Sequence, residues 1–374
     1  MSAQPHSIPS PAAPAEARPL TIRALRARGV TVPLTRPIRT AVGAIPAAPL
    51  VLIDVLTEEG ITGRAYIFGY TPLTLAPLVA FLTNLEEPLK GKAVVPAARA
   101  KDFEGTFRLL GRQGLVGMAL SGLDMALWDA LGRAADQPVV RLIGGAPTPL
   151  PAYDSYGIVD PAADRRALEQ SLDQGFRAIK IKLGDGDLDT DVATVAAVRD
   201  IIGPGVALMV DYNQSRTVTE TLRCIDRLAK YDIYWIEEPA PAEDLVGHAK
   251  IRAASPIPVQ TGENWWFAQD MAKAIAAGAC DYAMPDVMKI GGVTGWLRAM
   301  GLAEPAAIPV SSHAFVEASA HLLPVTPTAH WLEFLNKAEH ILTESMTVVD
   351  GQVTARGPGL GMDWDEDAVA RYAN

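Results

Sequence analysis

Three acidic residues recur at a fixed interval in the middle of the chain. Asp211 ends ALMVD, Glu237 lies in YWIEEP and Glu263 in PVQTGE, and both intervals, 237 minus 211 and 263 minus 237, are 26 residues. This is about the length of one strand, loop and helix in a repeating β/α unit. Carboxylates at the ends of neighbouring parallel strands converge, and they stay ionised together only around a cation. An all-oxygen set suits Mg²⁺ better than Zn²⁺, so the spacing predicts a magnesium site, although it does not decide between Glu237 and Glu238.

Two lysines precede this acidic series. Lys180 and Lys182 alternate in KIK, which places both on the inner face of a strand, and Asp211 and Asn213 share a face for the same reason. Mutual repulsion and partial burial would favour the neutral form of one lysine, as a base near neutral pH requires. The alternative interpretation is a pair of solvated surface lysines.

Further polar residues end the later strand-like runs. Asp286 and His313 fall on neighbouring strands, where a carboxylate would fix the tautomer of the ring and make it a general base. Glu333 would face the metal carboxylates, so we expect its pKa to be raised and the group to stay protonated. His248, His321 and His330 are expected to be ordinary polar residues whose hydrogen bonds are satisfied.

The elements that must position these groups form a repeat. Strand-like runs end near Tyr156, Leu183, Asn213, Glu238, Glu263, Asp286, His313 and Phe334. Amphipathic stretches such as TDVATVAAVRDIIG separate them, several closed by Gly as at a helix end. The pattern predicts a (β/α)7β TIM-like barrel over residues 148–347, with a full eighth helix doubtful because SAHLLPVTPTAH is short and contains two prolines.

The rest of the chain is predicted to form a cap. Residues 20–147 begin with extended segments and continue with helical periodicity, which indicates an N-terminal α+β capping domain. Asp124, Trp128 and Asp129 in its last helix are assigned packing and capping roles and no chemistry. Residues 1–19 are rich in Pro, Ala and Ser and are predicted to be a disordered tail, whereas residues 348–374 are expected to return to the capping domain.

Composition excludes several classes of function. The net charge of -10 in 374 residues disfavours nucleic acid and anionic membranes as partners. No apolar run is long enough for a spanning helix. The two cysteines, Cys224 and Cys280, form neither a disulfide framework nor a zinc motif, so we predict a reducing compartment and a cytoplasmic location.

These motifs, in this order, resemble the mandelate racemase branch of the enolase superfamily. The likeness extends from about Val32 to Pro358 and rests on KIK, VDYNQS, WIEEP, GEN, MPDVMKIGGVTGW, SSHAF and HWLEF. The resemblance implies Mg²⁺ as cofactor, a small 2-hydroxy carboxylate as substrate and a homo-oligomer, with an octamer suggested by the family.

The resemblance also implies roles for single residues. It assigns the metal to Asp211, Glu237 and Glu263, which settles Glu237 over Glu238. It assigns the two bases to Lys182 and to His313 paired with Asp286. Contacts to the substrate are then expected from Lys180 on its carboxylate, Asn213 on its α-hydroxyl and Glu333 as hydrogen-bond donor to the developing enolate.

The remaining residues expected around the substrate differ in part from the family pattern. They are Ser155, Tyr156, Val42, Ile45, Phe68, Tyr70 and Ala314. Tyr156 stands where a histidine is expected, and Ala314, Val316, Thr261 and Phe334 replace a leucine, a glutamine, a methionine and an arginine. Arg36 and Arg39 are new in the segment that leads to the cap. The catalytic set is kept while the edge of the substrate site changes.

The function these features predict is racemisation of mandelate or a related aryl 2-hydroxy acid by two bases through an enolate. The first alternative is dehydration of an acid sugar, which the apolar side chains of Val42, Ile45 and Phe68 disfavour. Cycloisomerases and dipeptide epimerases rely on a lysine at the sixth strand, and Lys289 lies near that position, but the His313 and Asp286 pair argues against that alternative. A non-catalytic metal-binding barrel is the remote alternative.

Overall fold

The computed structural model describes residues 19–41 and 43–374. The predicted tail, residues 1–19, falls outside these ranges except for its last residue, and Val42 falls outside them too. The predicted disorder of the tail and the substrate contact expected of Val42 therefore concern residues outside the described ranges.

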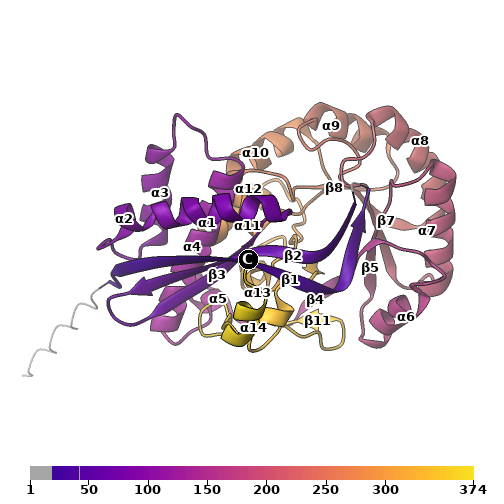
Figure 1. The fold of residues 1–374 in the computed structure, drawn as a ribbon. Coiled ribbons are helices and arrows are strands. Elements are labelled where there is room, and N and C mark those ends of the chain that lie inside the picture. Colours follow the sequence, from indigo (N-terminus) through magenta and orange to yellow (C-terminus); the bar gives the residue numbers. More distant parts are fainter. Residues whose placement is uncertain (1–18, 42) are drawn as a thin grey trace, which may run out of the picture.

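An antiparallel meander forms the N-terminal part of the structure. Strands β1 (Ile22–Thr40), β2 (Gly43–Thr57) and β3 (Thr62–Phe68) pair in order, with the Glu58–Gly60 turn between β2 and β3. The helices that follow are α1 (Leu75–Asn84), α2 (Glu86–Leu89), α3 (Pro96–Thr106), α4 (Leu115–Ala134) and α5 (Val139–Leu142). Long β1 and β2 extend from this domain toward the barrel (Figure 1). These strands and helices confirm the predicted α+β capping domain.

A parallel sheet with helices outside it forms the second part (Figure 1). Its strands are β4 (Leu150–Ile158), β5 (Ala178–Lys182), β6 (Ala207–Asp211), β7 (Ile233–Glu237), β8 (Val259–Thr261), β9 (Tyr282–Ala283) and β10 (Leu332–Phe334), and β10 pairs with β4. The alternating helices are α6 (Arg165–Asp173), α7 (Leu188–Ile202), α8 (Val218–Leu228), α9 (Leu245–Ala254), α10 (Phe267–Ala277), α11 (Val287–Ile290), α12 (Gly292–Ala303) and α13 (Val316–Leu322). The order confirms a (β/α)7β barrel.

The seventh barrel position differs from the expected regular strand. Residues 309–313 fill it through single bridges: Val310 pairs with Ala283 and Ala329, and His313 pairs with Asp286. Prolines at 285 and 309 lack the N–H group that a continuous ladder needs. The segment nevertheless closes the barrel between β9 and β10, so it presents His313 at the expected place.

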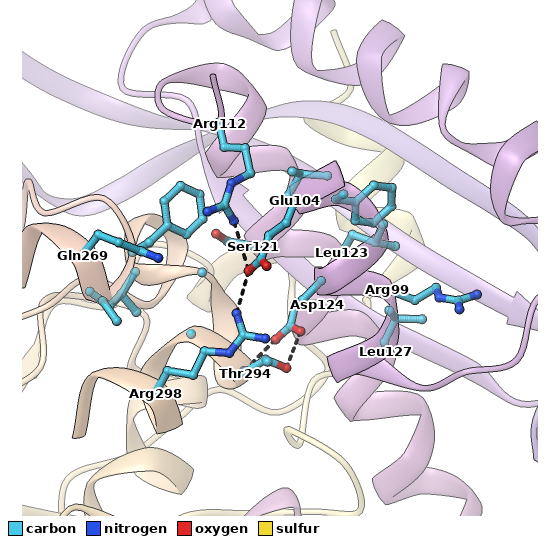
Figure 2. Close-up of a pocket in the computed structure, with 18 residues that line it drawn as sticks. Arg99, Glu104, Arg112, Ser121, Leu123, Asp124, Leu127, Gln269, Thr294 and Arg298 are labelled. Carbon is cyan, nitrogen blue, oxygen red and sulfur yellow. Dashed lines mark hydrogen bonds and ion pairs between the residues drawn. The ribbon is translucent and has the colours of Figure 1, made fainter. Parts of the chain in front are cut away.

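Buried polar contacts join the cap to the barrel. Asp124 on α4 accepts hydrogen bonds from the N–H of Thr294 on α12 (2.9 Å) and from its hydroxyl (2.6 Å). Beside them Glu104 on α3 binds Arg298 at 2.8 Å and Arg112 at 3.5 Å, around a cavity of about 60 Å³ (Figure 2). Asp124 therefore has the packing role expected of it, although it is buried rather than solvated.

The C-terminal segment lies against the capping sheet. It contains β11 (Gln352–Val353) and α14 (Glu366–Arg371), and the exposed C-terminus lies near the middle of the view in Figure 1. The N–H of Thr31 donates to the Tyr372 carbonyl at 2.9 Å, and Arg28 contacts Glu366 at 2.5 Å. The segment thus contacts the cap through β1, while β11 pairs with β4 of the barrel, and the domain division at 147 and 347 stays a prediction.

Helix α4 is long and apolar enough, by length and composition, to cross a membrane. However, 78% of its apolar stretch is buried inside the protein. This is the pattern of a core helix, in which Leu123, Leu127 and Ala130 are fully buried.

Candidate active site

Three carboxylates meet at the carboxyl ends of neighbouring strands. Asp211 ends β6, Glu237 ends β7 and Glu263 follows β8, and one oxygen of each lies within 4.8 Å of the others. All three are buried, and Glu263 Oε2 accepts no hydrogen bond from the described residues, although His313 Nε2 lies 3.2 Å from it. Three hard oxygen donors with one unsatisfied are the donor set that Mg²⁺ accepts.

The neighbouring Glu238 lies outside this triad. Its two carboxylate oxygens accept from the Asn264 amide at 2.9 and 2.8 Å. Glu237 instead accepts from Lys180 at 2.6 Å and from the Trp235 indole at 3.0 Å. Burial raises the pKa of Glu237 to about 8, against the lowering effect of Lys180. An additional cation at the triad would relieve this cost of ionisation.

The two lysines of β5 point into the barrel as predicted, but their protonation differs from the prediction. Lys180 Nζ lies 2.6 Å from Glu237 and 2.7 Å from Glu333, and Lys182 donates to Asp211. Burial lowers the pKa of each lysine, yet the carboxylates more than offset it and both pKa values are raised. The predicted neutral lysine is therefore wrong for this arrangement, because repulsion between the lysines is weaker than their attraction to the carboxylates. Mg²⁺ bound to Asp211 would weaken that attraction and lower the pKa of Lys182 toward that of a base.

The predicted protonation of Glu333 is also wrong. Its Oε1 accepts from Ser155 Oγ at 2.7 Å, and its Oε2 accepts from the N–H of Ala314 at 2.7 Å. Burial raises the pKa of Glu333, but the charges of Lys180 and other cations nearby lower it below the usual value. In this structure Glu333 is a carboxylate that accepts hydrogen bonds, not an acid that donates one.

His313 and Asp286 form the expected pair. His313 Nδ1 lies 2.6 Å from Asp286 Oδ2, and the other oxygen of Asp286 accepts from the N–H of Met288 at 2.6 Å, at the start of α11. Burial lowers the pKa of His313, but nearby Glu263, Glu333 and Asp286 raise it above the usual value overall. The pair fixes the ring with Nε2 toward Glu263, which is the geometry of an oriented general base.

Three other predicted substrate contacts lie at the same end of the barrel. Asn213, in the left-handed region at φ 42°, donates to Asp211 through its N–H and its amide, and its buried Oδ1 has no partner among the described residues. Ala314, at φ 50°, and Ser155 both donate to Glu333. These residues are therefore grouped around the triad, with the Asn213 oxygen left available.

The structure contradicts the prediction that Tyr156 contacts the substrate. Because Ser155 points inward on β4, Tyr156 points outward to the helices. Its hydroxyl lies 2.6 Å from Ser171 Oγ on α6, and the Arg36 guanidinium stacks 3.6 Å from its ring centroid. Arg36 also contacts Asp154 at 2.6 Å, so this arginine fastens β1 to β4 instead of altering the substrate site.

The cap contributes two aromatic residues at the site. The rings of Phe68 and Tyr70 lie 4.7 Å apart, and the N–H of Phe68 donates to Met288 Sδ at 3.3 Å. Ile45 is half-buried on β2 and pairs with Ile38 across the hairpin. The apolar cover expected from Phe68 and Tyr70 is therefore in place over the end of the barrel.

One lysine beside these aromatic residues was not predicted. Lys337 follows β10 and its Nζ lies 4.9 Å from the Phe68 ring centroid. The sequence signal was weak, because Lys337 stands in an irregular segment with no strand alternation to assign its direction. Lys289, discussed above only as an alternative base, lies 4.8 Å from the Tyr70 ring and donates to Asn264 Oδ1 at 2.5 Å.

Family comparisons agree with this architecture. Residues 23–144 match the mandelate racemase / muconate lactonizing enzyme N-terminal domain, and residues 163–368 match the enolase C-terminal domain-like family. The protein belongs to the mandelate racemase branch of the enolase superfamily. It is an enzyme of that superfamily, which sets aside a non-catalytic barrel.

Individual relatives of this superfamily member have several activities. A crystal structure of an enolase from Bradyrhizobium, complexed with magnesium and mandelic acid, is 56% identical with a TM-score of 0.94, covering 96% of this chain and 99% of that one. The 3,6-anhydro-alpha-L-galactonate cycloisomerase of Streptomyces coelicolor is 34% identical, covering 88% of this chain and 93% of that protein. The L-talarate/galactarate dehydratase of Salmonella typhimurium is 30% identical, covering 69% and 66%. Magnesium in the neighbouring structure and the triad here confirm the expected cofactor.

Proposed function

We propose that this enzyme racemises mandelate or a related aryl 2-hydroxy acid by removing the proton next to the carboxylate and returning one to the opposite face. The observation that carries the proposal is the placement of the two bases. Lys182 lies on β5, next to β6 and its Asp211, and His313 lies beyond β8 and its Glu263. One base therefore stands on each side of the row of three carboxylates.

The chain's own groups can meet the charge that develops on the substrate. Asp211, Glu237 and Glu263 would hold Mg²⁺, which supplies positive charge beside the substrate carboxylate when bound. Lys180 supplies a second positive charge, and it is fixed between Glu237 and Glu333 before substrate arrives. Groups fixed in advance stabilise the transition state without a reorganisation cost.

Two observations support an aryl acid. Phe68 and Tyr70 of the cap pack against each other beside Met288 and Lys289, which follow barrel strand β9. The Bradyrhizobium relative, the more similar of those compared above, holds mandelic acid. We infer that an aryl group of the substrate packs beneath this cover.

Dehydration of an acid sugar is the second candidate. It is favoured by the dehydratase and cycloisomerase relatives, and the same bases could remove the proton and assist loss of a β-hydroxyl. The cycloisomerase-type role of Lys289 is less well supported, because its Nζ is already bound to Asn264.

A parallel screen separates the candidates. The purified protein with Mg²⁺ is given single enantiomers of mandelate and of ring-substituted mandelates, and optical rotation is followed. Acid sugars are tested for 2-keto acid formation under the same conditions. We expect rotation to decay to zero for the aryl acids and little 2-keto acid to form. Efficient dehydration without any loss of rotation would replace the racemase proposal with the dehydratase.

A further inference from the structure

Lys337 is a buried cation without a side-chain or backbone acceptor. It is 5% exposed, and within the described residues no hydrogen bond or ion pair reaches its Nζ. Its Nζ lies over the Phe68 ring, 4.9 Å from the ring centroid. Little solvent reaches this side chain and no protein acceptor replaces the lost hydration, which is costly for an ammonium group, so its position favours binding of an anion.

The surroundings of Lys337 place it over the reaction site. The groups that act on its charge include Glu333, Asp286 and Glu263, which come from the ends of different strands. Burial lowers the pKa of Lys337, and these carboxylates do not fully offset that effect. Lys337 therefore lies within electrostatic range of the site carboxylates, and its aromatic neighbour, Phe68, belongs to the cap.

The other lysines of the site are already engaged. Lys180 and Lys182 contact carboxylates of the triad, and Lys289 donates to Asn264 at 2.5 Å. Among the residues that the structure describes at this end of the barrel, Lys337 is thus the lysine that no protein acceptor binds. A substrate that has only one carboxylate, directed to Lys180 and the metal, would leave it unpaired.

We propose that Lys337 binds a second anionic group, at the end of the substrate under the cap, and so makes the enzyme selective for 2-hydroxy acids that carry two anionic groups. The inference rests on the proposed function, because it assumes that the α-carboxylate is bound at the triad and Lys180. Lys337 is then a specificity-determining residue that contacts the substrate and takes no part in proton transfer.

Binding measurements test the proposal apart from turnover. Racemic mandelate and racemic 4-carboxymandelate are titrated calorimetrically into the Mg²⁺-loaded enzyme, because a racemate undergoes no net racemisation during the titration. We expect the wild type to bind 4-carboxymandelate more tightly. Lys337→Met should reduce that preference about tenfold or more, as expected for loss of a charge-assisted hydrogen bond.

Two further variants make the result specific. Lys337→Arg keeps the charge and should retain most of the preference. Lys273→Met removes an exposed lysine, with 66% of its side chain exposed on α10, and should change neither affinity. Equal losses for both ligands in Lys337→Met, an unchanged preference, or a wild type that does not prefer the dianion would overturn the proposal.

Failure of the proposed function has a different signature. Exchange of the α-proton with solvent deuterium is measured on the same ligands by NMR. If the dianion preference depends on Lys337 but no ligand exchanges its α-proton, the racemase proposal falls and the binding role of Lys337 stands.

Discussion

Lys180 Nζ lies 2.7 Å from Glu333 Oε1, and both side chains are about 1% exposed. The two groups come from β5 and β10, which flank β4 on either side, so the ion pair spans the place where the barrel closes. Because Ser155 and the Ala314 N–H also donate to Glu333, the carboxylate is ionised and holds Lys180 in position before substrate binds.

Replacing Glu333 tests this assignment. Glu333→Gln should destabilise the metal-free protein by about 1 to 3 kcal/mol, the usual cost of losing hydrogen bonds to a charged group. If Glu333 were protonated, Glu333→Gln should leave the free energy of unfolding nearly unchanged, because a neutral amide resembles a neutral acid in shape and charge. The free energy of unfolding in urea, without Mg²⁺, decides between them, and an unchanged value would show that Glu333 is neutral in the free protein.

The metal site is tested by changing one ligand at a time. Glu263→Gln or Asp211→Asn should give a folded protein whose affinity for Mg²⁺ falls at least about tenfold, because even outer groups around a metal cost that much when removed. The measurement is the rise in melting temperature on adding Mg²⁺. Glu238→Gln is the matched control, because Glu238 binds Asn264 outside the triad. An equal loss of Mg²⁺ affinity in Glu238→Gln would contradict the assignment of Glu237, and not Glu238, to the metal site.

Strand spacing explains why much of this site could be predicted. Asp211, Glu237 and Glu263 end successive strands of one repeat, so their convergence follows from the fold. The pair of His313 and Asp286 was predictable for the same reason, even though residues 309–313 form bridges instead of a regular strand. Alternation along a strand is a local property that tertiary contacts did not override.

Properties that depend on several strands at once were predicted poorly. The charge states of Lys180 and Glu333 depend on each other's position, which no single segment contains. Tyr156 was misplaced because family position was preferred over strand alternation, which puts it opposite to Ser155. Lys337 was missed because its direction is set by an irregular segment after β10.

The outward position of Tyr156 leads to a stability effect without a catalytic one. Tyr156→Phe removes the hydroxyl that lies 2.6 Å from Ser171 and should cost about 1 kcal/mol of stability. Neither kcat nor KM should change, because the ring and its contact with Arg36 are kept. Unfolding in urea and steady-state kinetics are measured on the same preparation. A change in KM that depends on the ring substituent of the substrate would return Tyr156 to the substrate site.

The contact between cap and barrel should make stability depend on pH. Burial raises the pKa of Asp124 from 3.8 to about 7, although its hydrogen bonds from Thr294 lower it in part. Between about pH 4 and 7 the folded protein therefore keeps a proton that the unfolded chain has released, so this group's contribution to stability falls as pH rises. Asp124→Asn cannot titrate. In Asp124→Asn, the difference in unfolding free energy between pH 5 and pH 8 should therefore be smaller than in the wild type by on the order of 1 to 3 kcal/mol. An unchanged difference would contradict the raised pKa of Asp124.

The two bases should be separable by isotope exchange. His313→Asn removes one base and leaves Lys182 in place on the other side of the triad, so racemisation should fall by about 10² to 10⁴ or more. One enantiomer of the substrate should still exchange its α-proton with solvent deuterium, because Lys182 can remove and return a proton on its own face. Lys182→Met should show the opposite enantiomer preference while His313, oriented by Asp286, remains active. Proton NMR of each enantiomer in D₂O with Mg²⁺ measures the exchange directly. Exchange of both enantiomers in His313→Asn, or of the same enantiomer in both variants, would mean that the bases do not act on opposite faces.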